Sequence, residues 1–238
     1  MMTFGSLFAG IGGFDLGLER AGMKCKWQVE IDPFCRKVLQ KHWPEVPRYR
    51  DVREIEKIES VDIICGGPPC QRTSVAAAIF GNRTGESLWG EMARIVQENM
   101  PTWVIVEQPP GNKKWETEVT VDLEGLGYCV DRFVRSALLC GAPHERRRVF
   151  FVANTLRERL DTFTRLRESS SIIEKSWPSP PRGTWRSPRT GTCRMDDGLP
   201  DWVDRIKSLG NAVIPQVIKH IGLNIINANN GFQRTRSR

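Results

Sequence analysis

The feature that most constrains the fold is an alternation of short apolar segments with helical segments over the first 153 residues. Short apolar runs such as Val61–Cys65 are typical of strands buried on both faces of a sheet. The alternation predicts an α/β fold, a sheet with helices on both faces. We expect strands at Thr3–Phe8, Cys25–Val29, Val61–Cys65, Trp103–Val106, Phe133–Leu139 and Val149–Ala153, the last two as a pair. We expect helices at Gly13–Ala21, Pro33–His42, Glu86–Asn99 and Thr117–Leu126.

The composition changes after residue 154. Residues Thr155–Gly198 have no clear periodicity. Within them, the window Thr155–Met195 carries nine basic against four acidic side chains, which is most of the chain's net charge of +7. This excess is mild evidence for a polyanionic partner, although a solvated loop would have the same composition. Regular structure is expected again from Pro200, with helices at Trp202–Ile206 and Pro215–Asn227 and a turn at Gly210-Asn211.

Length and composition exclude several classes of protein. The 238 residues suffice for one domain with a small appendage, and 39% hydrophobic residues provide a core. Seven cysteines, none in a C-x-x-C pair, and three scattered histidines predict neither a disulfide framework nor a metal site. No apolar run approaches the ~18 residues of a membrane span, and the N-terminus lacks the basic segment of a signal peptide.

A glycine-rich loop, Leu7–Gly13 (LFAGIGG), joins the first expected strand to the first helix. Glycines let the backbone turn sharply and approach a ligand, and the helix that follows offers unpaired N–H groups to negative charge. The dinucleotide pattern G-x-G-x-x-G is incomplete here, so a simple tight turn stays an alternative. Glu30 ends the second strand about twenty residues later, where an acid can bind ribose hydroxyls, and Asp51 could hold an adenine amino group. Either acid could also be an ordinary loop carboxylate.

Cys70 directly follows the expected strand Val61–Cys65, in the stretch Gly66–Gln71 (GGPPCQ). This places its thiol at the carboxyl edge of a strand, where α/β folds bind ligands. Two glycines and two prolines make a stiff, shaped turn that a buried structural cysteine would not need. The setting favours a nucleophile over a structural thiol.

Glu107 follows three apolar residues of the strand at Trp103–Val106, so we expect it to be partly desolvated. Desolvation would raise its pKa and suit it to donating a proton, although a solvated loop glutamate is the alternative. Arg146 and Arg148 precede the strand at Val149–Ala153, and a β-like backbone would put both on one face. Two guanidinium groups on one face need an anionic or polar partner if they are buried.

Together these residues resemble the C5-cytosine-specific DNA methyltransferase family. The likeness covers roughly residues 4–153 and 199–226, and it joins the LFAGIGG loop, Glu30-Ile31, Asp51-Val52, Pro69-Cys70-Gln71, Glu107, Arg146-x-Arg148 and Gly210–Val213 in the family's order. It implies a Rossmann-like fold that uses S-adenosyl-L-methionine and has a mixed, mostly parallel sheet. Residues 1–154 would be the catalytic domain, and residues 199–228 would return to it. Residues 155–198 would be a reduced target-recognition region and 229–238 a disordered basic tail.

The resemblance also implies a role for each group. Cys70 would add to C6 of a flipped-out cytosine, Glu107 would engage N3, and Arg148 would hold O2 with Arg146 beside it. Cofactor contacts would come from Phe8, Ala9, Gly10, Ile11, Gly12, Gly13, Glu30, Ile31, Asp51, Val52, Pro69, Leu88, Asn211 and Ala212. Contacts to double-stranded DNA would come from Gln71, Ser74, Arg83, Trp177, Arg182, Trp185, Arg186, Arg189 and Arg194. A cytoplasmic, nucleoid-associated monomer without metal is expected, and a cognate restriction endonuclease stays an open partner.

The sequence departs from the family at four places. Gln108-Pro109-Pro110 replaces the usual residues after the glutamate, His144 replaces a glutamine, and Thr73 stands where phenylalanine is common. The region before Gly210 is short, so sequence specificity would be relaxed or read by few side chains. Two alternatives therefore stay open: methylation of cytosine in tRNA, and a catalytically silent protein that binds nucleic acid or S-adenosylmethionine.

Overall fold

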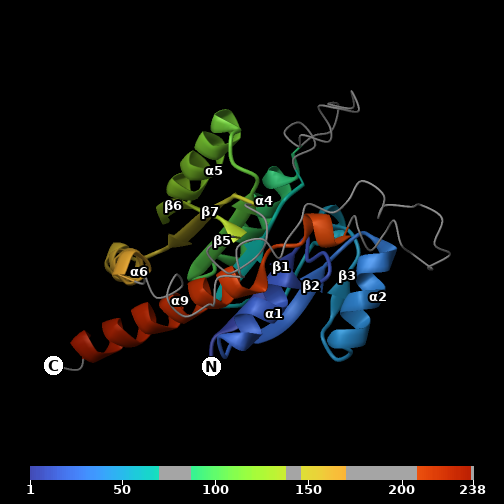
Figure 1. The fold of residues 1–238 in the computed structure, drawn as a ribbon, viewed down its shortest axis with the longest axis horizontal. Helices are drawn as coiled ribbons and strands as arrows, with labels where there is room; N and C mark the ends of the chain where they lie inside the picture. Colours follow the sequence, from blue (N-terminus) through green and yellow to red (C-terminus); the bar gives the residue numbers. More distant parts are fainter. Residues whose placement is uncertain (70–86, 138–145, 170–207, 237–238) are drawn as a thin grey trace, which may run out of the picture.

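The computed structural model describes residues 1–69, 87–137, 146–169 and 208–236 (Figure 1). Seven strands of this part form one sheet in the order β3-β2-β1-β4-β5-β7-β6. Strands β3, β2, β1, β4 and β5 are parallel, and β7 is antiparallel to both β5 and β6. The strands are β1 (Thr3–Leu7), β2 (Lys24–Val29), β3 (Arg48–Tyr49), β4 (Ile63–Gly66), β5 (Trp103–Gln108), β6 (Cys129–Arg135) and β7 (Arg148–Asn154). The expected mixed, mostly parallel sheet is confirmed.

Helices cover both faces of this sheet. Strand side chains alternate between two apolar clusters, so that Ile63 and Cys65 belong to one and Ile64 to the other. The first cluster is completed by α1, α6 and α9, and the second by α4, α5 and the short helix η1. The helices are α1 (Gly13–Arg20), α2 (Pro33–His42), η1 (Val52–Glu54), α4 (Trp89–Asn99), α5 (Lys113–Gly125), α6 (Arg157–Ser169) and α9 (Pro215–Arg236). Among the described residues, no helix is long and apolar enough to span a membrane.

Two helices correct the expectations for the second half of the chain. Residues 157–169 form α6, although no periodicity was expected after residue 154. Leu160 and Phe163 of α6 are fully buried against the sheet, and its remaining described positions are largely polar. The tail from residue 229 was expected to be disordered, but α9 continues to Arg236. Trp103 explains part of this, because its indole Nε1 donates to Asn229 Oδ1 at 3.3 Å.

Smaller differences concern the ends of elements. Strand β6 begins at Cys129 and ends at Arg135, whereas Phe133–Leu139 was expected. Helix α4 begins at Trp89 instead of Glu86, and α5 begins at Lys113 instead of Thr117. The helix expected at Trp202–Ile206 lies outside the described residues.

The parallel strands bring several loops to one edge of the sheet. β1, β2, β4 and β5 all end there, so the glycine loop, Glu30 and Gly67 belong to neighbouring connections, and Glu107 lies next to them near the end of β5. In α/β folds this edge is where ligands bind.

Candidate active site

The glycine loop has a backbone that favours glycine. Gly10 and Gly12 have φ angles of 56° and 87°, and a Cβ on Gly10 would meet no atom within 4 Å. A Cβ on Gly12 would instead lie 2.4 Å from the Trp43 ring of the α2–β3 connection. The loop is therefore packed on one side and open at Gly10, as a cradle for a ligand would be.

Glu30 joins this loop to the end of β2. Its Oε2 accepts a hydrogen bond from the Gly10 amide at 2.7 Å, and its Oε1 accepts one from the Asp32 amide at 2.8 Å. The carboxylate is nearly buried, whereas the next side chain, Ile31, is 53% exposed. A fixed carboxylate beside an exposed apolar side chain fits the ribose and the base of a nucleoside. The residues therefore fit the adenosyl part of S-adenosylmethionine.

The neighbouring residues Asp51 and Val52 have different surroundings, one polar and one apolar. Asp51 caps η1 and forms an ion pair with Arg53, and these contacts lower its pKa to about 2. Asp51 is thus an ionised acceptor beyond the end of β3. The side chain of Val52 is buried in the apolar cluster, so its side chain serves packing.

The segment Gly210–Val213 lies directly against the start of α1. A Cβ on Gly13 would approach the Val213 carbonyl oxygen to 2.6 Å. Asn211 is exposed and Ala212 is half-buried at this contact. The structure therefore brings the late Gly-Asn motif next to the glycine loop, as expected from the resemblance.

Glu107 is a buried acid at the same edge of the sheet. It lies within β5, opposite Phe150 of β7, and not in a loop after the strand. Burial raises the pKa of Glu107 to about 7, although the positive charges of Arg148 and Arg146 act to lower it. The expected desolvated acid with a raised pKa is confirmed, and such a group can exchange a proton near neutral pH.

The two arginines reach their partners in different ways. Nε of Arg148, at the start of β7, lies 2.7 Å from Glu107 Oε1. Arg146 precedes the strand with a φ of 30°, so the expected β-like backbone with both arginines on one face is wrong. Its guanidinium donates instead to the Ala212 carbonyl at 2.7 Å. Both arginines still act on Glu107, but only Arg148 does so through an ion pair.

Gln108 has a contact that sequence reasoning missed. Its buried side-chain amide donates to the carbonyl of Pro68, two residues before Cys70. A Cβ on the adjacent Gly67 would lie 3.0 Å from Glu107 Oε2. From the sequence, Gln108 is only a departure from the family's usual residue. Its position next to a buried acid was the available signal, because a buried amide needs a hydrogen-bond partner. The residues after β4 are therefore in direct contact with the end of β5, Pro68 with Gln108 and Gly67 with Glu107.

A buried polar group beneath the glycine loop was also missed. Asp15, in the first turn of α1, accepts hydrogen bonds from Ser6 Oγ at 3.2 Å and Gln28 Nε2 at 2.9 Å. Burial raises the pKa of Asp15. A polar residue on an apolar helix face was the available signal, and the network ties α1 to β1 and β2.

Several predicted residues lie outside the described part. They include the expected nucleophile Cys70 and every predicted DNA contact: Gln71, Ser74, Arg83, Trp177, Arg182, Trp185, Arg186, Arg189 and Arg194. Of the other expected cofactor contacts, exposed Pro69 accepts a hydrogen bond at 3.4 Å from the amide of half-buried Leu88. Phe8, Ala9 and Ile11 are in the glycine loop, where Phe8 has a φ of 53°.

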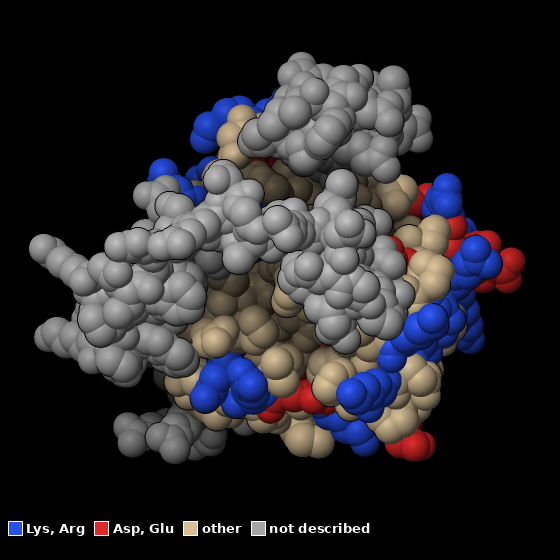
Figure 2. Space-filling model, turned by 45° about the vertical axis from the view of Figure 1, so that its right-hand side comes forward, with Lys and Arg blue, Asp and Glu red and all other residues tan. Residues whose placement is uncertain are grey.

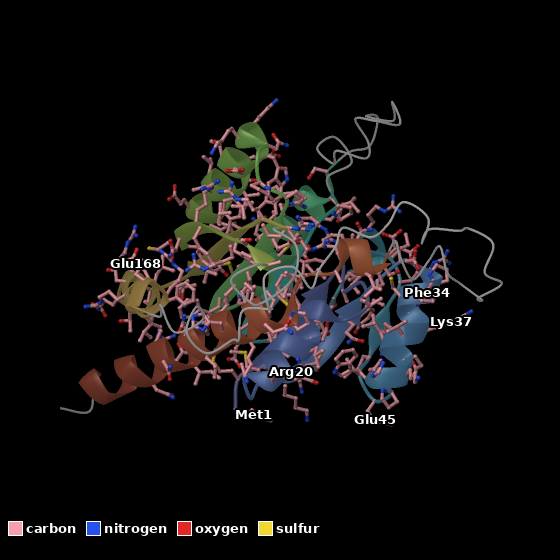
Figure 3. The ribbon with its side chains drawn as sticks, in the orientation of Figure 1. Met1, Arg20, Phe34, Lys37, Glu45 and Glu168 are labelled. Atoms are coloured by element: carbon pink, nitrogen blue, oxygen red, sulfur yellow. The ribbon has the colours of Figure 1, made fainter. Side chains whose placement is uncertain are left out.

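The described surface shows mixed charge. On the face in Figure 2, the described residues are neutral near the centre, and Lys and Arg lie beside Asp and Glu around the rim. Figure 3 places Phe34 and Lys37 of α2 at one end of the molecule and Glu168 of α6 at the other. The described residues that are visible on this face therefore carry both signs of charge.

This fold and edge define a class of protein. The sheet order, with an antiparallel β7 beside β5, and the glycine loop followed by an acid at the end of β2 are those of Rossmann-like, S-adenosylmethionine-dependent methyltransferases. The chain matches the family described as C-5 cytosine-specific DNA methylase over residues 2–193. It therefore belongs to this family.

Individual relatives agree with this assignment. Type II methyltransferase M2.BsuMI of Bacillus subtilis is 32% identical over 166 residues, covering 66% of this chain and 43% of that protein. Type II methyltransferase M.HgiBI of Herpetosiphon aurantiacus is 34% identical over 168 residues, covering 66% and 38%. The solved structure of a DNA modification methyltransferase encoded within an Escherichia coli prophage has a TM-score of 0.54 at 27% identity, covering 65% and 47%. The chain thus matches less than half the length of these relatives.

Proposed function

We propose that the protein transfers a methyl group from S-adenosylmethionine to C5 of cytosine in double-stranded DNA. The observation that carries the proposal is the buried pair Glu107–Arg148, at the same sheet edge as the glycine loop and the strand that leads to Cys70. Membership of the cytosine-specific family supports the reaction, and the names of the type II methyltransferases it matches support DNA as the substrate.

The chemistry requires a nucleophile and an acid on the same ring. C5 of cytosine is a weak nucleophile until a thiolate adds to C6. The Cys70 thiolate would form the S–C6 bond while the protonated Glu107 gives its proton to N3, so that C5 gains enamine character. The raised pKa of Glu107 leaves this carboxyl partly protonated near neutral pH. Arg148 would hold the cytosine O2 and stabilise the negative charge that develops there.

The cofactor site would use the loop at the end of β1. Glu30 would bind the ribose hydroxyls, and Ile31 would pack against the adenine. Because Gly10 has no side chain, the ligand could approach the backbone of the loop closely there. S-adenosylmethionine supplies the methyl group from its sulfonium when it is bound. A base then takes the C5 proton, the double bond between C5 and C6 re-forms as the Cys70 thiolate leaves, and N3 returns its proton to Glu107. Because Cys70 must reach C6, the target base must leave the DNA stack.

The contacts to DNA would come mainly from the basic window after residue 154. The predicted contact residues, most of them in residues 155–198, would supply phosphate contacts for affinity and a few contacts in a groove. A basic excess of this kind predicts binding that weakens as salt increases.

The experiment is covalent trapping on DNA that contains 5-fluorocytosine. Fluorine at C5 blocks the final elimination, so the enzyme with S-adenosylmethionine should form a complex with DNA that survives denaturation. Cys70→Ala is the control and should form none. A complex on the matching RNA but not on DNA would favour tRNA as the substrate. No complex on either, with S-adenosylhomocysteine binding intact, would favour the silent binding protein.

A further inference from the structure

The strongest feature that the proposed mechanism does not explain is the contact between Arg146 and the segment Gly210–Val213. One terminal nitrogen of Arg146 donates to the Ala212 carbonyl at 2.7 Å, which joins positions 66 residues apart in the chain. The Nε of the same guanidinium is buried and has no hydrogen-bond partner among the described residues. The contact to Ala212 is therefore the one hydrogen bond that the described residues give this side chain.

The backbone of Arg146 has an unusual conformation at this contact. Its φ of 30° lies in a region that residues other than glycine adopt rarely. Such a conformation persists where the surrounding structure holds it, and it is common at functional sites. The turn before β7 therefore sends Arg146 toward Ala212, while Arg148 points to Glu107.

The other end of the contact lies at the cofactor loop. Val213, next to Ala212, packs so closely on Gly13 that a Cβ there would clash with its carbonyl oxygen at 2.6 Å. Gly13 is the first residue of α1 and the last of the glycine loop. Ala212 is thus one residue away from a close contact with the start of α1, a contact that involves both the backbone and the side chain of Val213.

We propose that Arg146 is a positioning residue that holds the segment Gly210–Val213 against the cofactor loop. Its hydrogen bond to the Ala212 carbonyl fixes Ala212 and the neighbouring Val213 against Gly13. This differs from a contact to the cytosine, which the resemblance implied for Arg146. The inference rests on the proposed function, because it takes the glycine loop as the cofactor site.

The test is the affinity for S-adenosylhomocysteine, measured by calorimetry without DNA. Arg146→Met keeps most of the side-chain volume but removes the charge and every donor. Loss of one charge-assisted hydrogen bond that holds the site should raise Kd roughly five- to tenfold. Arg146→Lys retains a donor and should recover part of the affinity. Arg147→Met is the matched control, because the Arg147 side chain is exposed, and its Kd should equal that of the wild type.

Two further measurements, the binding stoichiometry and the KM for S-adenosylmethionine, distinguish lost positioning from partial unfolding of the variant. A partly unfolded sample lowers the number of binding sites per chain and leaves Kd unchanged, whereas lost positioning raises Kd at full stoichiometry. The KM for S-adenosylmethionine should rise by the same factor as Kd. A wild-type Kd in Arg146→Met, or an equal loss in Arg147→Met, would overturn the inference and leave the proposed function standing. Failure of the folded wild type to bind S-adenosylhomocysteine would overturn both.

Discussion

Arg148 Nε lies 2.7 Å from Glu107 Oε1, and this ion pair is largely buried between β5 and β7. The pair forms because β7 runs antiparallel to β5, which brings the start of β7 to the end of β5. Burial alone would keep Glu107 neutral, and the arginine alone would keep it ionised. The two effects together place its proton exchange close to physiological pH, which is what a donor to a ring nitrogen needs.

Glu107 should make the stability of the folded protein depend on pH. Because burial raises its pKa from 4.5 to about 7, the folded protein retains a proton between these values that the unfolded chain releases. The corresponding stability is complete below about pH 4.5 and is lost as the pH rises through 7. The loss is on the order of 3 kcal/mol. Urea unfolding of the wild type and Glu107→Gln at pH 5 and pH 8 measures it.

The variant provides the control in that experiment. Glu107→Gln cannot titrate, so the difference in unfolding free energy between the two proteins should change across this range. Parallel pH dependence in both proteins would show that Glu107 keeps an ordinary pKa.

Gly13→Ala should damage the contact between the glycine loop and the late Gly-Asn motif. The added Cβ would lie 2.6 Å from the Val213 carbonyl oxygen, a backbone atom that cannot rotate away. We expect a loss of about 1–3 kcal/mol in unfolding free energy, together with weaker binding of S-adenosylhomocysteine. Thermal unfolding and calorimetry measure the two effects.

The matched control is Gly90→Ala in α4. A Cβ on Gly90 would meet no atom within 4 Å, and alanine favours the helix. It should leave cofactor affinity unchanged and should stabilise the protein by roughly 0.5–1 kcal/mol. Equal stability of Gly13→Ala and the wild type would mean that the Gly210–Val213 segment is not packed on α1.

Gln108 should position the loop that carries Cys70. Gln108→Ala would leave the carbonyl of the buried Pro68 without its donor, at a cost of about 1–3 kcal/mol. We expect methyl transfer to slow, whereas Gln108→Asn, which retains the amide, should be tolerated. Single-turnover rates at saturating cofactor distinguish the two variants. Complete inactivation by Gln108→Asn would mean that this loop has a geometry which the family's usual asparagine cannot supply.

The sequence predicted the sheet well where strands are buried on both faces. The runs around Ile63–Gly66 and Trp103–Gln108 are apolar because helices cover them from both sides. It predicted β6 and its pairing with β7 but placed the strand four residues too late, because this edge strand carries Asp131 and Arg132 and has no such run. Their charges are satisfied by ion pairs with Arg167 of α6 and Glu116 of α5, which sequence patterns do not display.

The site was predictable in parts. A glutamate after an apolar run predicted the burial of Glu107, because the run itself indicates a buried strand. The contact of Arg146 with Ala212 was not predictable, because it depends on one backbone angle and on a segment far along the chain. The likeness to a known family orders such motifs in the sequence but does not fix which atoms meet.

The most direct test of the account is whether the protein makes 5-methylcytosine in DNA. The protein is incubated with S-adenosylmethionine and mixed-sequence duplex DNA, and the nucleosides are measured by mass spectrometry, with Cys70→Ala beside it. The account predicts a 5-methylcytosine signal with the wild type that disappears in Cys70→Ala. An equal signal from both proteins, or none from a folded wild type with bound cofactor, would contradict it.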